Sequence, residues 1–152
     1  MTPLKTTWGF LFRLFPCPTR VGLRRIGNPG PDSPVLVTCN FHLTVRRLKK
    51  LLRHLDLWLL VADSKGVNVW CAAGAEEFNT HSVVSAVKTS GIEEMVNHRT
   101  LILPPLGAPG IKAADVRAKT GWKTKWGPVY AEDIPRYAAG GFKRDEGMKR
   151  VK

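Results

Sequence analysis

Residues 35–62 read VLVTCNFHLTVRRLKKLLRHLDLWLLVA, and this stretch decides the fold class. It opens with a short β-branched and aliphatic run, Val35–Cys39, after a proline-rich turn sequence, which is typical of a buried strand. Apolar side chains then recur every three or four residues over residues 43–55, which predicts an amphipathic helix with a basic outer face. A second apolar run, Leu57–Ala62, predicts another buried strand.

The same alternation of short apolar runs and helical patterns continues along the chain. Further extended segments are expected at residues 67–70, 100–103 and 122–126, and helices at residues 80–91, 92–97, 113–119 and 131–139. Asn79 or Thr80 is expected to cap the first of these helices, and Gly91 to end it. Strands that alternate with helices predict a three-layer α/β domain with a mostly parallel, Rossmann-like sheet. Ligands of such sheets bind at the loops after the carboxyl ends of the strands.

Length and composition indicate one globular domain. The chain has 152 residues, of which 43% are hydrophobic, so it can bury a core and is not expected to be disordered. The α/β domain is expected at residues 22–140, after an aromatic and basic arm at 1–21 and before a basic tail at 141–152. No apolar run is long enough to cross a bilayer. The tail would suit the cytoplasmic flank of a membrane segment in a longer parent chain.

The net charge of +12 is the strongest signal in the composition. The basic residues lie mainly on the two flanks, and residues 71–110 form the one net-acidic stretch. Such a surface attracts nucleic acid, anionic lipid or an acidic protein partner. No RNA- or DNA-binding motif is visible, so nucleic acid is not the expected partner. A basic module that binds RNA or an anionic membrane, with a merely structural Cys71, remains the alternative of a different class.

The three cysteines, Cys17, Cys39 and Cys71, are an odd number without a CxxC pair. This pattern argues against a disulfide scaffold and a structural zinc site, and favours reduced thiols in the cytoplasm. Cys71 lies in NVWCAAG, residues 68–74, directly after a predicted extended segment. A nucleophilic cysteine needs a base to form the thiolate, and the sequence places no histidine beside it.

Two roles remain for Cys71 on residue chemistry alone. A single cysteine can bind a metal that a macrocycle already holds, and small residues after it would let the backbone approach a flat ring. Trp70 and Phe78 would then supply apolar walls. Burial as a small hydrophobic residue is the commoner role of a free cysteine, and the spacing alone favours it.

The loop at residues 106–110, LGAPG, follows another predicted strand. Its backbone N–H groups could approach a phosphate closely, although a plain turn between strand and helix is the simpler interpretation. Because both NVWCAAG and LGAPG follow strands, they are expected at one edge of the sheet as two walls of one crevice.

Several blocks in the same order resemble the mercury-methylation corrinoid protein, a relative of the corrinoid subunit of the CO dehydrogenase/acetyl-CoA synthase complex. The blocks are GNP at 27–29, PDSPVLVT at 31–38, DSKGVNVWCAAG at 63–74, HRTLILP at 98–104, LGAPG at 106–110 and GPVYAEDIP at 127–135. Together they cover nearly the whole chain from about Gly22 onward. Independent blocks in the right order make the resemblance far more specific than one short motif.

The resemblance implies a corrinoid-binding methyl-carrier domain, in which the Cys71 thiolate binds the cobalt of a cobalamin-type corrinoid from its lower face. A soft thiolate suits a soft, covalent cobalt centre. The residues implied to surround the corrinoid are Asn68, Val69, Trp70, Ala72, Ala73, Gly74, Phe78, Thr80, Gly107, Ala108, Pro109 and Gly110. The implied partners are a methyl-donor methyltransferase and a low-potential, ferredoxin-like iron–sulfur protein.

One segment departs from the mercury-methylating pattern. Methylators typically continue after the motif with lysine, glycine, threonine, phenylalanine, glycine and threonine, whereas residues 75–80 here read AEEFNT. Corrinoid binding is still expected, and methyl transfer to Hg(II) is retained as an alternative with little activity expected. Members of that family carry a membrane domain after the corrinoid domain, and this sequence does not include one. Membrane association would therefore depend on a C-terminal segment absent from this sequence. The domain is expected in the cytoplasm or at the inner face of the membrane.

Overall fold

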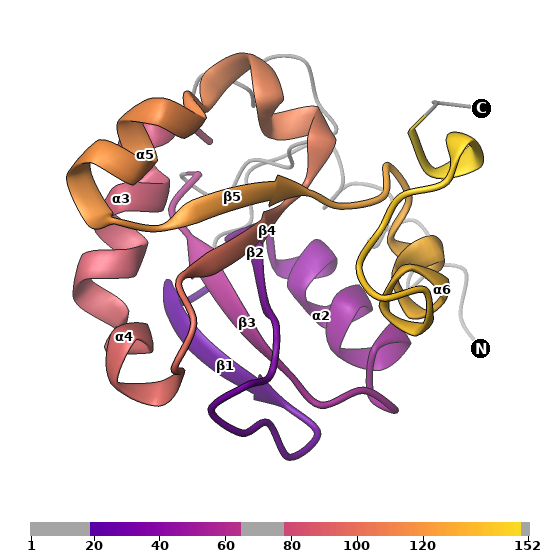
Figure 1. Cartoon of the computed structure of the whole chain (residues 1–152). Helices are drawn as coiled ribbons and strands as arrows, with labels where there is room; N and C mark the ends of the chain where they lie inside the picture. The colour runs from indigo at the N-terminus through magenta and orange to yellow at the C-terminus, as the bar shows by residue number, and fades with distance from the viewer. Residues whose placement is uncertain (1–18, 65–77, 150–152) are drawn as a thin grey trace, which may run out of the picture.

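A five-stranded sheet runs through the middle of the computed structural model, and helices cover both of its faces (Figure 1). The structure describes residues 19–64 and 78–149. The strands are β1 (Gly22–Ile26), β2 (Val35–Cys39), β3 (Leu57–Ala62), β4 (Thr100–Leu103) and β5 (Lys123–Trp126). Their order across the sheet is β1-β3-β2-β4-β5, and only β1 runs antiparallel to its neighbour. The predicted α/β class with a mostly parallel sheet is therefore confirmed.

The helices form two outer layers. They are α2 (His42–Leu51), α3 (Thr80–Ser90), α4 (Ile92–Met95), α5 (Ala113–Thr120) and α6 (Ile134–Ala139), with short 3-10 turns η2 (Pro105–Gly110), η3 (Ala131–Asp133) and η4 (Glu146–Lys149). Residues of α3, α4 and α5 pack on one face of the sheet, and residues of α2, α6 and η4 pack on the other. Figure 1 shows these groups on opposite sides of the strands.

Strand β3, which lies inside the sheet between β1 and β2, shows why its sequence is continuously apolar rather than alternating. Trp58, Leu60 and Ala62 enter the core cluster beneath α3 and α5. The residues between them, Leu59 among them, enter the cluster beneath α2 and α6. A strand that is buried on both faces has no solvent side on which polar residues would be favoured.

The predicted boundaries of α3 are confirmed by its caps. The Asn79 side chain accepts a hydrogen bond from the Ser82 backbone N–H, and the Ser82 hydroxyl accepts one from the Asn79 N–H. This reciprocal capping box satisfies two donors at the start of the helix. Gly91 ends the helix with φ of 76°, a left-handed conformation that favours glycine.

Two predicted helices are wrong in detail. The helix expected over residues 43–55 ends at Leu51, because the chain turns back towards β3 after it. Leu52 and Leu55 lie at helical spacing from the apolar residues before them because, in the turn after the helix, their side chains still pack on the core. The helix expected at 131–139 is split into η3 and α6, since Pro135 suits the first turn of a helix but not its interior.

Strand β1 was not predicted, because its sequence, GLRRI, carries two arginines. It lies at the edge of the sheet, where only one side is paired and charged residues are tolerated. The Arg25 guanidinium lies 5.2 Å from the centre of the Trp58 ring, so the strand gains a cation–π contact. The extended segment predicted at 67–70 and most of the N-terminal arm lie outside the described residues.

The basic tail is packed on the domain as far as Lys149. Met148 is only 2% exposed and belongs to the cluster beneath α2 and α6. The Val129 backbone N–H donates to the Met148 carbonyl at 2.9 Å, and Arg136 approaches Asp145 at 3.4 Å. Within residues 19–64 and 78–149, no helix is both long and apolar enough to cross a membrane.

We expect Leu60→Ala to lower the free energy of unfolding by roughly 2–5 kcal/mol, because it removes a fully buried side chain from the centre of the sheet. Urea denaturation followed by far-UV circular dichroism measures the change. Val21→Ala is the matched control, since Val21 is 39% exposed. Equal losses in the two variants would contradict the packing described for β3.

Candidate functional site

The carboxyl ends of β2, β3 and β4 meet at one edge of the sheet, because these strands are parallel. The connection after β2 runs through α2 to β3, on one side of β2. The next strand, β4, pairs on the other side of β2. The boundary between β2 and β4 is therefore a topological switch point, the place where open α/β sheets bind ligands. Residues from 40, 63 and 104 onward leave the sheet at this edge.

Asn40, the first residue after β2, ties three segments together. Its side-chain carbonyl accepts from the Ser64 backbone N–H at 2.8 Å and from the Ser64 hydroxyl at 2.9 Å. Its amide nitrogen approaches the Thr19 carbonyl at 3.3 Å and an Asp63 carboxylate oxygen at 3.4 Å. Its backbone carbonyl accepts from the Thr19 N–H at 2.9 Å. The network joins the end of β2 to the end of β3 and to the chain before β1.

Burial makes this network rigid. Asn40 is 4% exposed and Ser64 is fully buried. An amide removed from water is stable only when its polar atoms are paired, so the partners of Asn40 are fixed in place. Ser64 directly precedes residues 65–77, and Asn40 thus sets the point at which that segment leaves the sheet. This role of Asn40 was not predicted from the sequence. The available signal was that a polar residue directly follows each of two apolar strands, Asn40 after β2 and Asp63 after β3.

Phe78 and Asn79 anchor the chain on the other side of residues 65–77. The Phe78 side chain is fully buried in the cluster beneath α3 and α5. Asn79 caps α3, as described above. The structure thus places Phe78, one of the residues implied to line the corrinoid site, in the core of the domain. The packing of Phe78 fixes the chain just before Asn79, the residue that caps α3.

Thr80 joins the start of α3 to the loop after β4. Its hydroxyl accepts from the Lys112 backbone N–H at 2.8 Å and donates to the Gly110 carbonyl at 3.4 Å. Ile111, between them in the chain, is 4% exposed and packs in the core. The structure therefore brings together two of the predicted site residues, Thr80 and Gly110, from segments thirty residues apart.

The other predicted loop residues belong to η2, a tight turn between β4 and α5, which agrees with the simpler interpretation of the sequence. Ala108 is exposed, and its carbonyl accepts from the Ile111 N–H at 3.3 Å. Gly107 and Pro109 lie in the same turn. The predicted residues Asn68, Val69, Trp70, Cys71, Ala72, Ala73 and Gly74 lie outside the described residues. In the described part of the chain, no group of three His, Cys, Asp or Glu side chains could hold a metal ion.

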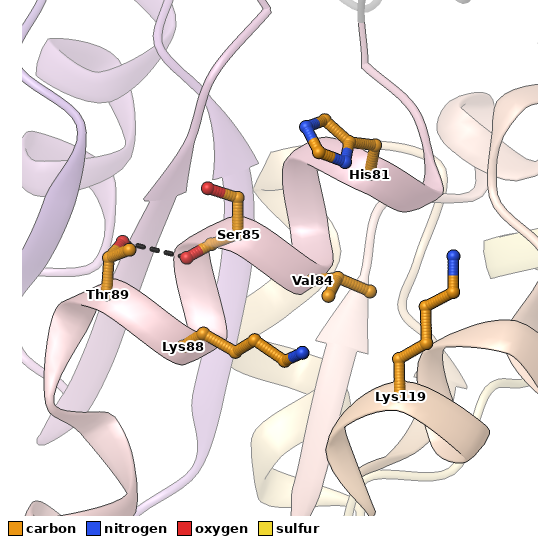
Figure 2. A pocket seen from close by; sticks show the side chains of 6 residues that line it. All are labelled: His81, Val84, Ser85, Lys88, Thr89 and Lys119. Carbon is orange, nitrogen blue, oxygen red and sulfur yellow. Dashed lines mark hydrogen bonds between the residues drawn. The ribbon is translucent and has the colours of Figure 1, made fainter.

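A groove of about 350 Å³ lies between α3 and α5, starting at the residue after Thr80. Its lining residues are His81, Val84, Ser85, Lys88, Thr89 and Lys119. Figure 2 shows Lys88 reaching from α3 and Lys119 rising from α5, with Val84 between them. The Thr89 hydroxyl is engaged with the Ser85 carbonyl at 2.7 Å. The lining carries two cations and no acidic side chain, so its charge favours an anionic group.

Comparison with known proteins assigns the same region to one family. The family model described as CO dehydrogenase/acetyl-CoA synthase delta subunit matches residues 15–138. Curated relatives include gamma subunits of the acetyl-CoA decarbonylase/synthase complex. That of Methanopyrus kandleri is 35% identical over 132 residues, or 86% of this chain and 27% of the relative. That of Archaeoglobus fulgidus is 37% identical over 116 residues, or 75% and 24%. The chain thus spans about a quarter of the length of these relatives.

We expect Asn40→Ala to lower the free energy of unfolding by roughly 1–3 kcal/mol, because it removes the side-chain oxygen that accepts from the buried Ser64 N–H and hydroxyl. Chemical denaturation measures the loss. Asn97→Ala is the matched control, since Asn97 is exposed and its recorded hydrogen bond uses only the backbone N–H. A loss no larger than that of the control would mean that the Asn40 network does not stabilise this edge.

We expect Thr80→Val to speed amide hydrogen exchange at Lys112 by about tenfold, because a nearly isosteric side chain removes the acceptor of that N–H. Thr80→Ser keeps the hydroxyl and should leave the exchange rate close to that of the parent. Exchange read residue by residue by NMR makes the comparison. Unchanged protection in Thr80→Val would show that the Thr80 hydroxyl does not hold the loop.

Proposed function

The chain belongs to the family of the CO dehydrogenase/acetyl-CoA synthase delta subunit, and we propose that its domain binds a cobalamin-type corrinoid and carries a methyl group on it. One structural observation carries the proposal. The chain on each side of residues 65–77 is tied to a neighbouring segment: Ser64, before them, bonds to Asn40 at the end of β2, and Thr80, after them, bonds to the loop that follows β4. These residues lie within the region that the family model matches.

Cys71 is the proposed ligand of the cobalt. Its segment lies in the sequence between Ser64 and Phe78, which are both fully buried, so the ends of the segment are fixed to the core. A thiolate is a soft donor that suits cobalt. Ala72, Ala73 and Gly74 would let the backbone come close to a flat macrocycle. The bound corrinoid supplies the methyl-transfer chemistry, and the protein supplies its position.

The scaffold residues act by restricting that position. A ligand on a segment held at both ends needs less ordering when the corrinoid binds, which favours affinity. The Asn40 amide and the Thr80 hydroxyl are engaged with protein atoms, so we assign them to holding the site rather than to contacting the corrinoid. The backbone of Ala108 and Gly110, both in the η2 turn, is the proposed second wall.

The proposed partners follow from the proposed corrinoid chemistry and from the names of the relatives. A low-potential, ferredoxin-like iron–sulfur protein would reduce the cobalt. A methyl-donor methyltransferase would supply the methyl group. The relatives are named as subunits of a complex, which supports partners of this kind. The proposed location is the cytoplasm.

The methyl acceptor separates two versions of the proposal. We favour a carrier of the acetyl-CoA synthase type over methyl transfer to Hg(II). The matched relatives are named for acetyl-CoA decarbonylase/synthase, and residues 75–80 differ from the mercury-methylating sequence. Membrane association would need a further segment and adds nothing to the chemistry of the domain.

The direct test is corrinoid binding followed by visible absorption. We expect the protein to bind added cob(III)alamin and to shift its spectrum, and Cys71→Ala to lose that shift and about tenfold or more in affinity, because the thiolate ligand is removed. Cys39→Ala is the matched control, since Cys39 is fully buried in the core and still leaves Cys71 in place.

Two outcomes would contradict the proposal. If the parent protein does not bind cob(III)alamin, the corrinoid function is wrong. If Cys71→Ala binds as tightly as the parent with the same spectrum, the domain binds a corrinoid but its cobalt ligand is not Cys71.

A further inference from the structure

Helix α2 carries a dense basic surface. Between residues 42 and 55 the chain has five basic residues and no acidic one. Four of them, Arg46, Lys49, Lys50 and Arg53, are exposed. Arg46, Lys49 and Lys50 lie three or four residues apart, or side by side in the sequence, on α2, and Arg53 follows in the turn after the helix ends at Leu51. Residues three or four positions apart are neighbours on one side of a helix. We refer to these four residues as the α2 basic face.

The charge of the α2 basic face is not compensated within the described part of the chain. The neighbouring Arg47 pairs with the Glu132 carboxylate, but none of the recorded ion pairs involves the four residues of the face. Arg53 contacts only the adjacent His54 ring, at 3.4 Å. Like charges at these helical spacings repel one another and destabilise the helix. An acidic surface placed over them would remove that repulsion.

The packing of α2 argues against a lipid bilayer as the partner. Its apolar side chains Val45, Leu48 and Leu52 are buried against the sheet, with exposures of 4%, 6% and 0%. An interfacial helix instead inserts its apolar face among the lipids. Since the apolar face is already used, α2 can offer a membrane only its charges.

The surface also lacks the features of a nucleic-acid site. Val21 and Met95 are the only large hydrophobic side chains exposed in the described residues, so no Phe, Tyr or Trp ring is exposed there for base stacking. The curated relatives are named as subunits of a protein complex. Charge and packing therefore favour an acidic protein.

The position of α2 connects this surface to the candidate site. α2 begins at His42, two residues after Asn40, so its first turn lies at the edge of the sheet where the site loops meet. It covers the face opposite α3 and α5 (Figure 1), which leaves the groove between those helices open. A protein bound along α2 would therefore approach the candidate site from the face of the sheet opposite the groove.

We propose that the α2 basic face is the docking surface for an acidic iron–sulfur electron-carrier protein. The identity of this partner rests on the proposed corrinoid function, in which a low-potential, ferredoxin-like iron–sulfur protein reduces the cobalt. The location of the surface rests only on charge, exposure and packing. Electrostatic complementarity of this kind raises the association rate and weakens steeply with salt.

The test measures binding of a purified acidic two-cluster ferredoxin to the protein loaded with cob(III)alamin, by titration calorimetry at low and high salt. The variant is Arg46→Glu with Lys50→Glu, and we expect it to bind about tenfold or more weakly at low salt. The matched control is Arg117→Glu in α5 with Lys123→Glu in β5, two exposed residues outside the groove lining, which makes the same change in net charge away from α2. We expect the control to lose less than about twofold. Circular dichroism confirms that each variant is folded.

Three results would overturn the proposal. They are no ferredoxin binding by the parent, equal losses in the two double variants, and tighter binding of the α2 face to duplex RNA or phosphatidylserine vesicles than to ferredoxin. The visible spectrum of bound corrinoid is recorded for each variant. A normal spectrum with no ferredoxin binding would reject the docking surface alone, whereas absence of corrinoid binding in the parent would reject the proposed function.

Discussion

The architecture of the candidate site depends on one buried amide. Asn40 stands where β2 ends, and its side chain holds Ser64 at the end of β3 and Thr19 before β1. Three strands are thereby tied together at one edge of the sheet, beyond the hydrogen bonds of the strands themselves. An apolar residue of similar size could fill the space, but it would remove the oxygen that accepts from the buried Ser64 N–H and hydroxyl. The edge is consequently rigid where residues 65–77 begin.

The sheet was predictable from the sequence because both of its faces are buried. Continuous apolar runs at Val35–Cys39 and Leu57–Ala62 have no other explanation in a chain of this composition, and the structure reproduces their bounds. Predictions failed where tertiary contacts outweigh local pattern. The two arginines of β1 are tolerated because an edge strand meets solvent, and the residues after Leu51 keep a helical spacing because they pack on the core from a turn.

The candidate site was only partly predictable from the sequence. Shared sequence blocks do not show which of their residues hold the fold together and which would contact a ligand. The GNP block lies away from the site, at the other end of the strands. There Gly27 has φ of 67° and a Cβ on it would collide with the Leu55 carbonyl, while the Asn28 N–H donates to Asp56. His98, in another block, joins Ser33 to Thr100. These residues are explained by packing and backbone conformation, without any ligand.

The same separation applies at the carboxyl edge. The resemblance implied that Phe78 and Thr80 surround the corrinoid, but the structure uses the Phe78 ring in the core and the Thr80 hydroxyl to hold Lys112 and Gly110. Under the proposed function, both residues would act on the corrinoid through the loops that they position. Direct contact would then fall to side chains and backbone on those loops. On this division of roles, a substitution at Thr80 should change how well the proposed site is preorganised, whereas a substitution at Cys71 should remove the proposed metal ligand itself. The two kinds of substitution can therefore be told apart, because the first acts through protein hydrogen bonds that the structure shows and the second acts through the proposed donor atom.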